Sequence, residues 1–133
     1  MQKPGVVIFT TVLNYVAAVF YGLGAIFSLI VVLLGARASA YQYVTKQIAN
    51  YYPQLHLAGS LQVIFGIILA VCLFSIWFHI WLGLGLLAGK KSCWYMQVVL
   101  SVIGLLAFPI GTVLNGIILF LFFRPNIREY FKV

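Results

Sequence analysis

Charge is what this sequence most lacks, and acidic charge above all. Only 7% of the 133 residues are charged, and Glu129 is the single acid among them. A soluble domain carries about 25% charged residues, because its surface must be solvated. Hydrophobic residues make up 65% of this chain, and its mean hydropathy is +1.14. The composition therefore excludes a soluble globular domain and predicts an integral membrane protein.

Histidine and cysteine are scarce as well, which restricts the chemistry available to the chain. His56 and His79 are the only histidines, and a helical rise separates them by about 34 Å along one helix. One chain cannot bring both rings to one metal ion or haem, and a haem shared by two copies of His79 is the arrangement left open. Cys72 and Cys93 are too far apart for a CxxC motif. We expect no metal, no cofactor and no enzymatic activity.

The net charge of +7 does not indicate a nucleic-acid-binding protein. Basic residues that bind nucleic acid cluster on a polar surface. Here they stand singly or in pairs at the ends of apolar runs, as charges that flank a membrane do. The expected partner is a lipid bilayer, and no nucleic acid is expected.

Apolar runs predict four membrane-spanning helices in a single transmembrane domain, residues 1–133. The spans are expected at about residues 5–35, 57–89, 93–108 and 110–123. The first is roughly 45 Å long as a helix, more than the roughly 30 Å hydrocarbon core, so it must tilt or project. The stretch 94–123 fits one long span or two short ones, and Pro109 with Gly111 marks the expected break.

The distribution of cations favours four spans over three. Four spans leave two cations outside, Arg37 and Lys46, and place the others in the cytoplasm: Lys3, Lys90, Lys91, Arg124, Arg128 and Lys132. Three spans would move the C-terminal cations outside, against the positive-inside rule. A hairpin of the last two helices that enters and leaves on the same side gives the same charge distribution. Both chain ends are therefore expected in the cytoplasm.

The segment between the first two spans, residues 38–55, is predicted to be an amphipathic helix on the membrane surface. Tyr41, Val44 and Ile48 recur at helical spacing, and polar residues occupy the other face. Pro53 is expected to end this helix. The alternatives are an extension of the first helix and a tyrosine-rich loop. The expected fold class is an all-α membrane four-helix bundle with an interfacial helix between the first and second spans.

One polar side chain on each predicted span is expected near the middle of the membrane. These residues are Asn14, His79, Ser101 and Asn115, each roughly 13–17 Å from the cytoplasmic edge. Polar groups in a membrane span are costly and often functional. One interpretation is a structural clamp of mutual hydrogen bonds, which we prefer. The other is a proton or ligand site in which His79 titrates.

Small residues four positions apart predict close approach of helices. The two pairs are Ala18 with Gly22 and Gly85 with Gly89. They serve packing inside the chain or contact with a partner chain. Glycine that merely faces lipid is the alternative, since it is common in membrane helices.

The second half of the chain carries a group of motifs at the predicted membrane boundaries. They are the run Gly83 to Leu87, the basic turn Gly89 to Lys91 with Trp94, the break Phe108 to Thr112, and the ending Arg124, Pro125, Arg128, Tyr130 and Phe131. In this part the chain resembles small uncharacterised four-helix proteins of the bacterial inner membrane. The resemblance implies that location and transfers no functional residue.

Function is expected to be interaction rather than catalysis. A small multidrug transporter needs a membrane-embedded glutamate and a quinone-linked thiol oxidoreductase needs CxxC, and the chain has neither. We expect an accessory subunit of a larger membrane complex or a self-associating scaffold, with other subunits or itself as partner. The alternative is a small channel, transporter or apolar-ligand binder that uses the mid-membrane polar layer.

Overall fold

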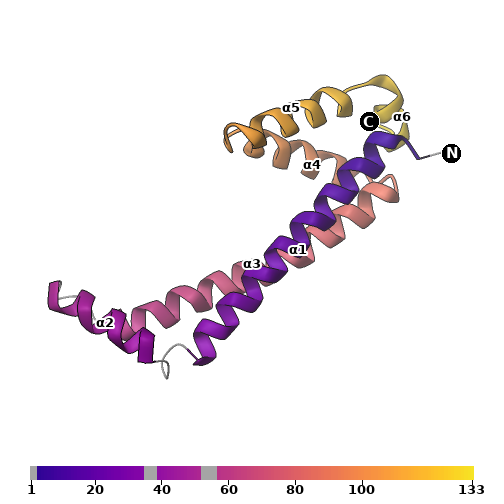
Figure 1. The fold of residues 1–133 in the computed structure, drawn as a ribbon. Coiled ribbons are helices and arrows are strands. Elements are labelled where there is room, and N and C mark those ends of the chain that lie inside the picture. The colour runs from indigo at the N-terminus through magenta and orange to yellow at the C-terminus, as the bar shows by residue number, and fades with distance from the viewer. Residues whose placement is uncertain (1–2, 35–38, 52–56) are drawn as a thin grey trace. The chain divides into compact units, whose positions relative to one another are not determined.

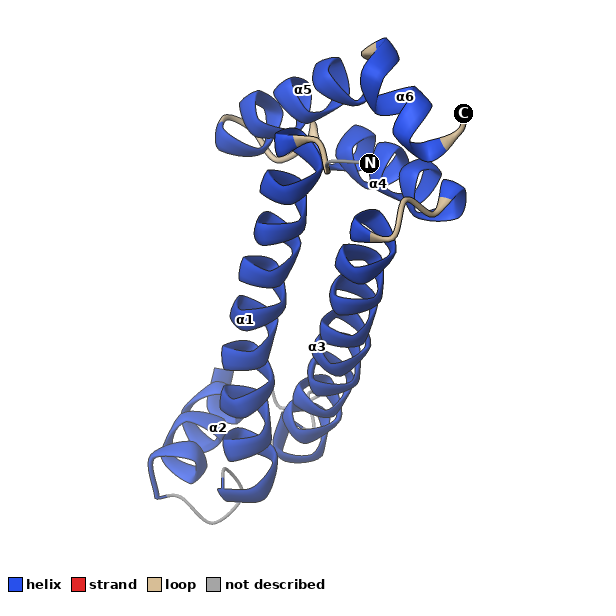
Figure 2. Ribbon diagram, turned by 90° about the vertical axis from the view of Figure 1, so that its right-hand side faces the viewer, coloured by secondary structure: helices blue, strands red, loops and turns tan. Residues whose placement is uncertain are grey.

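The computed structural model describes residues 3–34, 39–51 and 57–133, and the regular structure within them is entirely helical (Figure 2). Six helices follow one another along these residues: α1 Gly5–Leu34, α2 Ser39–Tyr51, α3 Leu57–Leu87, α4 Lys91–Gly104, α5 Ile110–Phe122 and α6 Pro125–Phe131 (Figure 1). The all-α class predicted from the sequence is therefore confirmed. Two helices are long and apolar enough to cross a membrane, α1 and the Gln62–Leu87 part of α3.

The stretch 94–123 contains two helices rather than one. α4 ends at Gly104 and α5 begins at Ile110, with Pro109 as its N-terminal cap residue. Proline cannot continue a helix, because it lacks an N–H and its ring clashes with the preceding turn. The hydroxyl of Thr112 donates to the carbonyl of Leu105 at 2.7 Å and ties the start of α5 to the end of α4. The two helices consequently lie side by side as a hairpin (Figure 1).

The chain divides into two compact units. Unit 1 comprises residues 1–17 and 78–133, and unit 2 comprises residues 18–77. α1 and α3 each contribute to both units, whereas α4, α5 and α6 belong to unit 1 and α2 to unit 2.

Unit 1 holds one apolar core, to which five of its segments contribute. The buried residues are Val7 of α1, Leu82 and Leu86 of α3, Cys93 and Trp94 of α4, Ile118 and Phe122 of α5, and Ile127 and Phe131 of α6. The sequence predicted no helix after the span that ends at about residue 123. α6 is a short helix because Ile127 and Phe131 lie one turn apart and both face the core, while Arg128 and Glu129 stay exposed.

In unit 2, α1 and α3 meet through small residues and aromatic rings. The rings of Phe27 and Phe65 meet edge to face with centroids 6.0 Å apart. Gly24 lies against Cys72, whose Sγ is 3.3 Å from the point where a Cβ on Gly24 would stand. The predicted amphipathic segment is helical from Ser39 to Tyr51, while Pro53, expected to end it, lies outside the described residues.

Gly85 provides a test of the packing in unit 1. A Cβ added there would overlap Sγ of the fully buried Cys93, so Gly85→Ala forces α3 and α4 apart. We expect Gly85→Ala to destabilise the fold by roughly 1–3 kcal/mol, measured by reversible unfolding in detergent. The matched control is Gly22→Ala, because nothing lies within 4 Å of a Cβ at Gly22. Equal stability of the two variants would contradict the packing described here.

Candidate functional site

A polar stripe on α1 forms one side of the candidate site. Thr10, Thr11 and Asn14 lie on one helical face and are at most 5% exposed. Two of them first bond to their own helix: Thr11 Oγ1 donates to the carbonyl of Val7 at 2.8 Å, and Asn14 Nδ2 donates to the carbonyl of Thr10 at 2.9 Å. These local bonds orient the side chains toward the rest of unit 1.

Asn14 is the centre of a hydrogen-bonded network that joins three helices. Its Oδ1 lies 2.8 Å from Nδ1 of His79 on α3, and its Nδ2 donates to Oε1 of Gln97 on α4 at 2.9 Å. Gln97 Nε2 in turn donates to Oγ of Ser101 at 3.3 Å, one turn further along α4. We call Asn14, His79, Gln97 and Ser101 the polar network. Asn14, Gln97 and Ser101 are at most 5% exposed, whereas His79 is only part-buried.

The hydrogen bond to the Thr10 carbonyl determines the orientation of the Asn14 amide, that is, where its NH₂ and its oxygen lie. A carbonyl accepts but cannot donate, so the group 2.9 Å from it must be the Asn14 NH₂. The Asn14 oxygen then faces His79 Nδ1, and this oxygen also only accepts. His79 Nδ1 therefore carries a hydrogen and donates it to Asn14, and in the neutral ring Nε2 is the acceptor.

The structure brings together three of the four residues expected to share a polar layer. Asn14 and His79 bond directly, and Ser101 joins them through Gln97. Asn115 stands apart: its Nδ2 donates to the carbonyl of Gly111 at 2.8 Å, and its amide packs on Gly104 within the α4–α5 hairpin. The position of a residue along the helix axis predicts its depth in the membrane, but it does not predict which neighbouring helix the side chain faces. Asn115 faces α4 within the hairpin.

Gln97 is the member of the network that the sequence analysis missed. Depth in the membrane predicted one polar residue from each span, and Ser101 was the residue of the third span. The spacing of Gln97 and Ser101 was the available signal, since residues four apart share one face of a helix. Two polar residues on one face of an apolar helix predict a buried polar side more strongly than either alone.

The four residues expected to serve helix packing have different surroundings. Ala18 is buried, and Gly85 lies against Cys93. Gly22 has open space where a Cβ would stand. Gly89 lies outside the helices, in the turn between α3 and α4, where its φ of 67° is a left-handed conformation that favours glycine. Gly89 therefore belongs to the turn that ends α3 and does not lie on a helix face.

The network consists of hydrogen-bond donors and acceptors and contains no acidic residue. Each amide hydrogen and oxygen named above is occupied by another member or by the backbone, which stabilises the contact of α1, α3 and α4. Thr10 Oγ1 is the single buried side-chain oxygen or nitrogen without a partner in the described part of the chain. Among the described residues no three His, Cys, Asp or Glu side chains are grouped to hold a metal ion.

A double-mutant cycle on Asn14 and Gln97 measures the strength of the network. We expect each alanine substitution to destabilise the fold, with a coupling free energy of roughly 0.6–2 kcal/mol between them. Asn14→Ala should cost more than Gln97→Ala, because it also leaves His79 Nδ1 without its acceptor. Thr10→Val is the control, since it removes a buried hydroxyl that has no partner and should not lower stability. Additive losses at Asn14 and Gln97 would rule out the network bond.

The position of the hydrogen on His79 is open to direct measurement. In ¹⁵N-histidine-labelled protein carrying His56→Gln, we expect the neutral His79 ring to show a protonated Nδ1 and an unprotonated Nε2. Asn14→Ala removes the acceptor and should shift the balance toward the other tautomer. A predominantly Nε2-protonated ring in the unsubstituted network would contradict the orientation of the Asn14 amide.

No protein-family model, no curated protein and no solved structure matches this chain. The hydrogen-bond geometry around Asn14 and the exposure of the helix surfaces are the observations from which a function can be inferred.

Proposed function

We propose that this chain is a multi-pass membrane protein that works as a non-catalytic interaction protein. Its role would be that of an accessory subunit in a larger membrane complex or of a self-associating scaffold. The observation that carries the proposal is the distribution of polar and apolar side chains, which is the reverse of that in a soluble domain.

Large apolar side chains are exposed along the two long helices, while polar ones are buried. Phe20 and Phe27 on α1 and Phe74 and Trp77 on α3 are each more than half exposed. Only 6% of the most apolar 18-residue stretch of α3 is buried inside the chain. In water such a surface would drive aggregation, whereas lipid tails solvate it at no cost. The buried polar network fits the same environment, because polar groups facing hydrocarbon must find partners inside the protein.

The proposed location is a bacterial inner membrane, with both chain ends in the cytoplasm. Lys3 and all cations from Lys90 onward belong to unit 1, whereas Lys46 belongs to unit 2. The positive-inside rule supports a cytoplasmic position for the charged end of unit 1. The resemblance of residues 83–131 to small four-helix inner-membrane proteins points the same way.

The proposed four-helix bundle includes α4 and α5, although both are short. They have 14 and 13 residues, fewer than the roughly 20 that a membrane-crossing helix needs. α5 and α6 are long and apolar enough to cross a membrane only when taken together, and they are bent by 75° at the break between them. The hairpin would therefore thin the bilayer locally or enter and leave on the same side.

Open glycine positions on the exposed helices support an interaction role. Nothing lies within 4 Å of the place where a Cβ would stand on Gly22 of α1 or on Gly66 of α3. In a membrane, small residues permit close approach of a second helix, and van der Waals contact drives the association. Both positions belong to unit 2, and no atom of the described residues occupies the space beside them where a Cβ would stand.

The polar network supports the structural clamp over a transport path. Its amides bond to one another and to the backbone, so they already serve to hold α1, α3 and α4 together. The second candidate, a small channel, transporter or apolar-ligand binder, is favoured by the buried and unpaired Thr10 hydroxyl. Replacing His79 by leucine separates the two: a clamp loses stability, whereas a binding site loses ligand and keeps its fold.

The mass of the complex that contains this chain is the direct test of the interaction role. After extraction with native lipid, we expect a mass above that of one 14.8 kDa chain, from other subunits or from further copies. Gly22→Leu should lower the fraction in the complex severalfold, because a large side chain blocks close helix approach. The variant should keep the fold of the single chain, since the position is open.

Gly24→Leu is the matched comparison for this experiment. A side chain at this position meets Cys72 inside unit 2. Gly24→Leu should therefore lower the stability of the single chain, which Gly22→Leu should not. A lone chain after gentle extraction, unchanged in mass by Gly22→Leu and Gly66→Leu, would remove the basis for the interaction role.

A further inference from the structure

Cations from two separate segments of the chain remain exposed in unit 1. Two of them lie where α3 meets α4, Lys90 in the turn and Lys91 as the first residue of α4, and three lie in and around α6, Arg124, Arg128 and Lys132. We call these five residues the basic surface. Glu129 is the single acid in the segments that carry them. Five positive charges with one negative charge among them attract an anionic partner.

Direct contacts hold the two segments together. The hydroxyl of Tyr130 on α6 donates to the carbonyl of Leu87 at 2.8 Å, directly before the Lys90 turn. The Tyr130 carbonyl lies 3.3 Å from the point where a Cβ on Gly89 would stand, so this turn and α6 are in close contact. A larger residue at Gly89 would push α6, and with it Arg128, away from the lysines.

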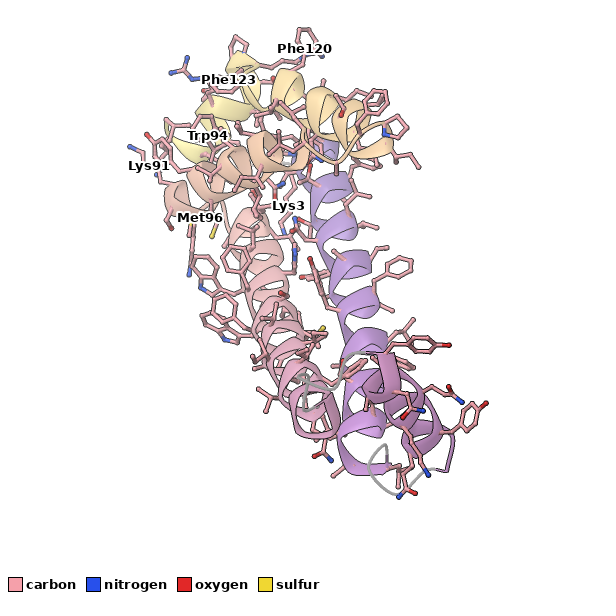
Figure 3. All side chains as sticks on the ribbon, turned by 90° about the vertical axis from the view of Figure 1, so that its left-hand side faces the viewer. Lys3, Lys91, Trp94, Met96, Phe120 and Phe123 are labelled. Atoms are coloured by element: carbon pink, nitrogen blue, oxygen red, sulfur yellow. The ribbon has the colours of Figure 1, made fainter. Side chains whose placement is uncertain are left out.

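The second link joins the start of α4 to the end of α5. The indole of Trp94 donates to the carbonyl of Phe122 at 3.3 Å, and its ring meets that of Phe123 at a centroid distance of 5.5 Å. Lys91 precedes Trp94 by three residues and Arg124 directly follows Phe123, and Lys91, Trp94 and Phe123 come from the same part of unit 1 (Figure 3). The basic surface is thus a product of tertiary contacts.

Aromatic and apolar side chains stand next to the basic surface. Phe120 on α5 and Phe123 directly after it are 69% and 54% exposed, and the Arg124 guanidinium lies 5.5 Å from the centre of the Phe120 ring. Tyr95 is also exposed, with its ring against Trp94. Aromatic rings next to cations are typical of the headgroup level of a membrane, where an acyl chain lies below the phosphate.

We propose that the basic surface binds the headgroups of anionic phospholipids in the cytoplasmic leaflet. The inference rests on the proposed membrane location and adds a ligand class to it. The cations contact the phosphate and any further negative charge of the headgroup, while Phe120 and Phe123 contact the acyl chains. The exposed apolar rings beside the cations favour a lipid over an acidic protein, which would offer them no acyl chain.

The test uses the full chain in nanodiscs that contain equal amounts of phosphatidylglycerol and phosphatidylcholine. Lipids that remain bound after release from the disc are counted by native mass spectrometry. We expect phosphatidylglycerol to be enriched severalfold over phosphatidylcholine on the unsubstituted chain. Lys91→Gln with Arg128→Gln should abolish this enrichment, because each cation near an anionic surface contributes about a fivefold preference and the loss of two removes up to roughly 25-fold.

Charge-preserving and distant substitutions serve as controls. Lys91→Arg with Arg128→Lys should keep the enrichment, and Lys46→Gln on the exposed face of α2 should leave it unchanged. Inorganic phosphate at constant ionic strength should not compete, since it lacks acyl chains. Equal retention of both lipids, equal loss in the Lys46 variant, or displacement by inorganic phosphate would each overturn the proposal. So would an acidic protein bound at the same cations in place of lipid.

Carbonate washing of the membranes separates this inference from the proposed function. A chain that leaves the membrane in carbonate is not integral, and both proposals fail together. A chain that resists carbonate but shows no preference for phosphatidylglycerol overturns the lipid inference alone. Retention in carbonate together with charge-dependent enrichment supports both.

Discussion

The amide of Asn14 is the group on which the packing of unit 1 most depends. It bonds to its own helix, to His79 on α3 and to Gln97 on α4, all within 2.9 Å. Apolar helices can slide past one another with little change in contact energy, because leucine packs against valine at many offsets. A buried amide cannot, since every unmade hydrogen bond in apolar surroundings costs free energy. The network therefore selects one register for these three helices.

That register explains where small residues are needed. With His79 opposite Asn14, the next turn of α3 presents Gly83 to Tyr15 and Thr11 of α1, and an added Cβ would lie 2.8 Å from the Tyr15 ring. One half-turn further, Gly85 faces Cys93 of α4. The polar network and the glycines thus act together. The network determines the register of the helices, and the glycines allow the helix backbones to approach closely enough for its hydrogen bonds to form.

The positions of the helices follow from the local sequence, and so does the break between α4 and α5. Long apolar runs predicted helices ending near Gly35 and Gly89, and the structure ends them at Leu34 and Leu87. Pro109 and Gly111 predicted the interruption that separates α4 from α5, because a proline ring and a flexible glycine disfavour a continuing helix. α6 was missed, since seven residues with one cation and one acid among them carry little helical periodicity.

The sequence by itself determined the all-helical class, the apolar surface of the long helices and the ends of most elements. These depend on residue type and on neighbours within one or two turns, which the order of residues states directly. Only the tertiary structure decided that Asn14 meets Gln97 while Asn115 turns into its own hairpin, and that α6 returns to the Lys90 turn. Such pairings depend on the rotation of each helix about its axis, and rotation is decided by contacts between residues far apart in the chain.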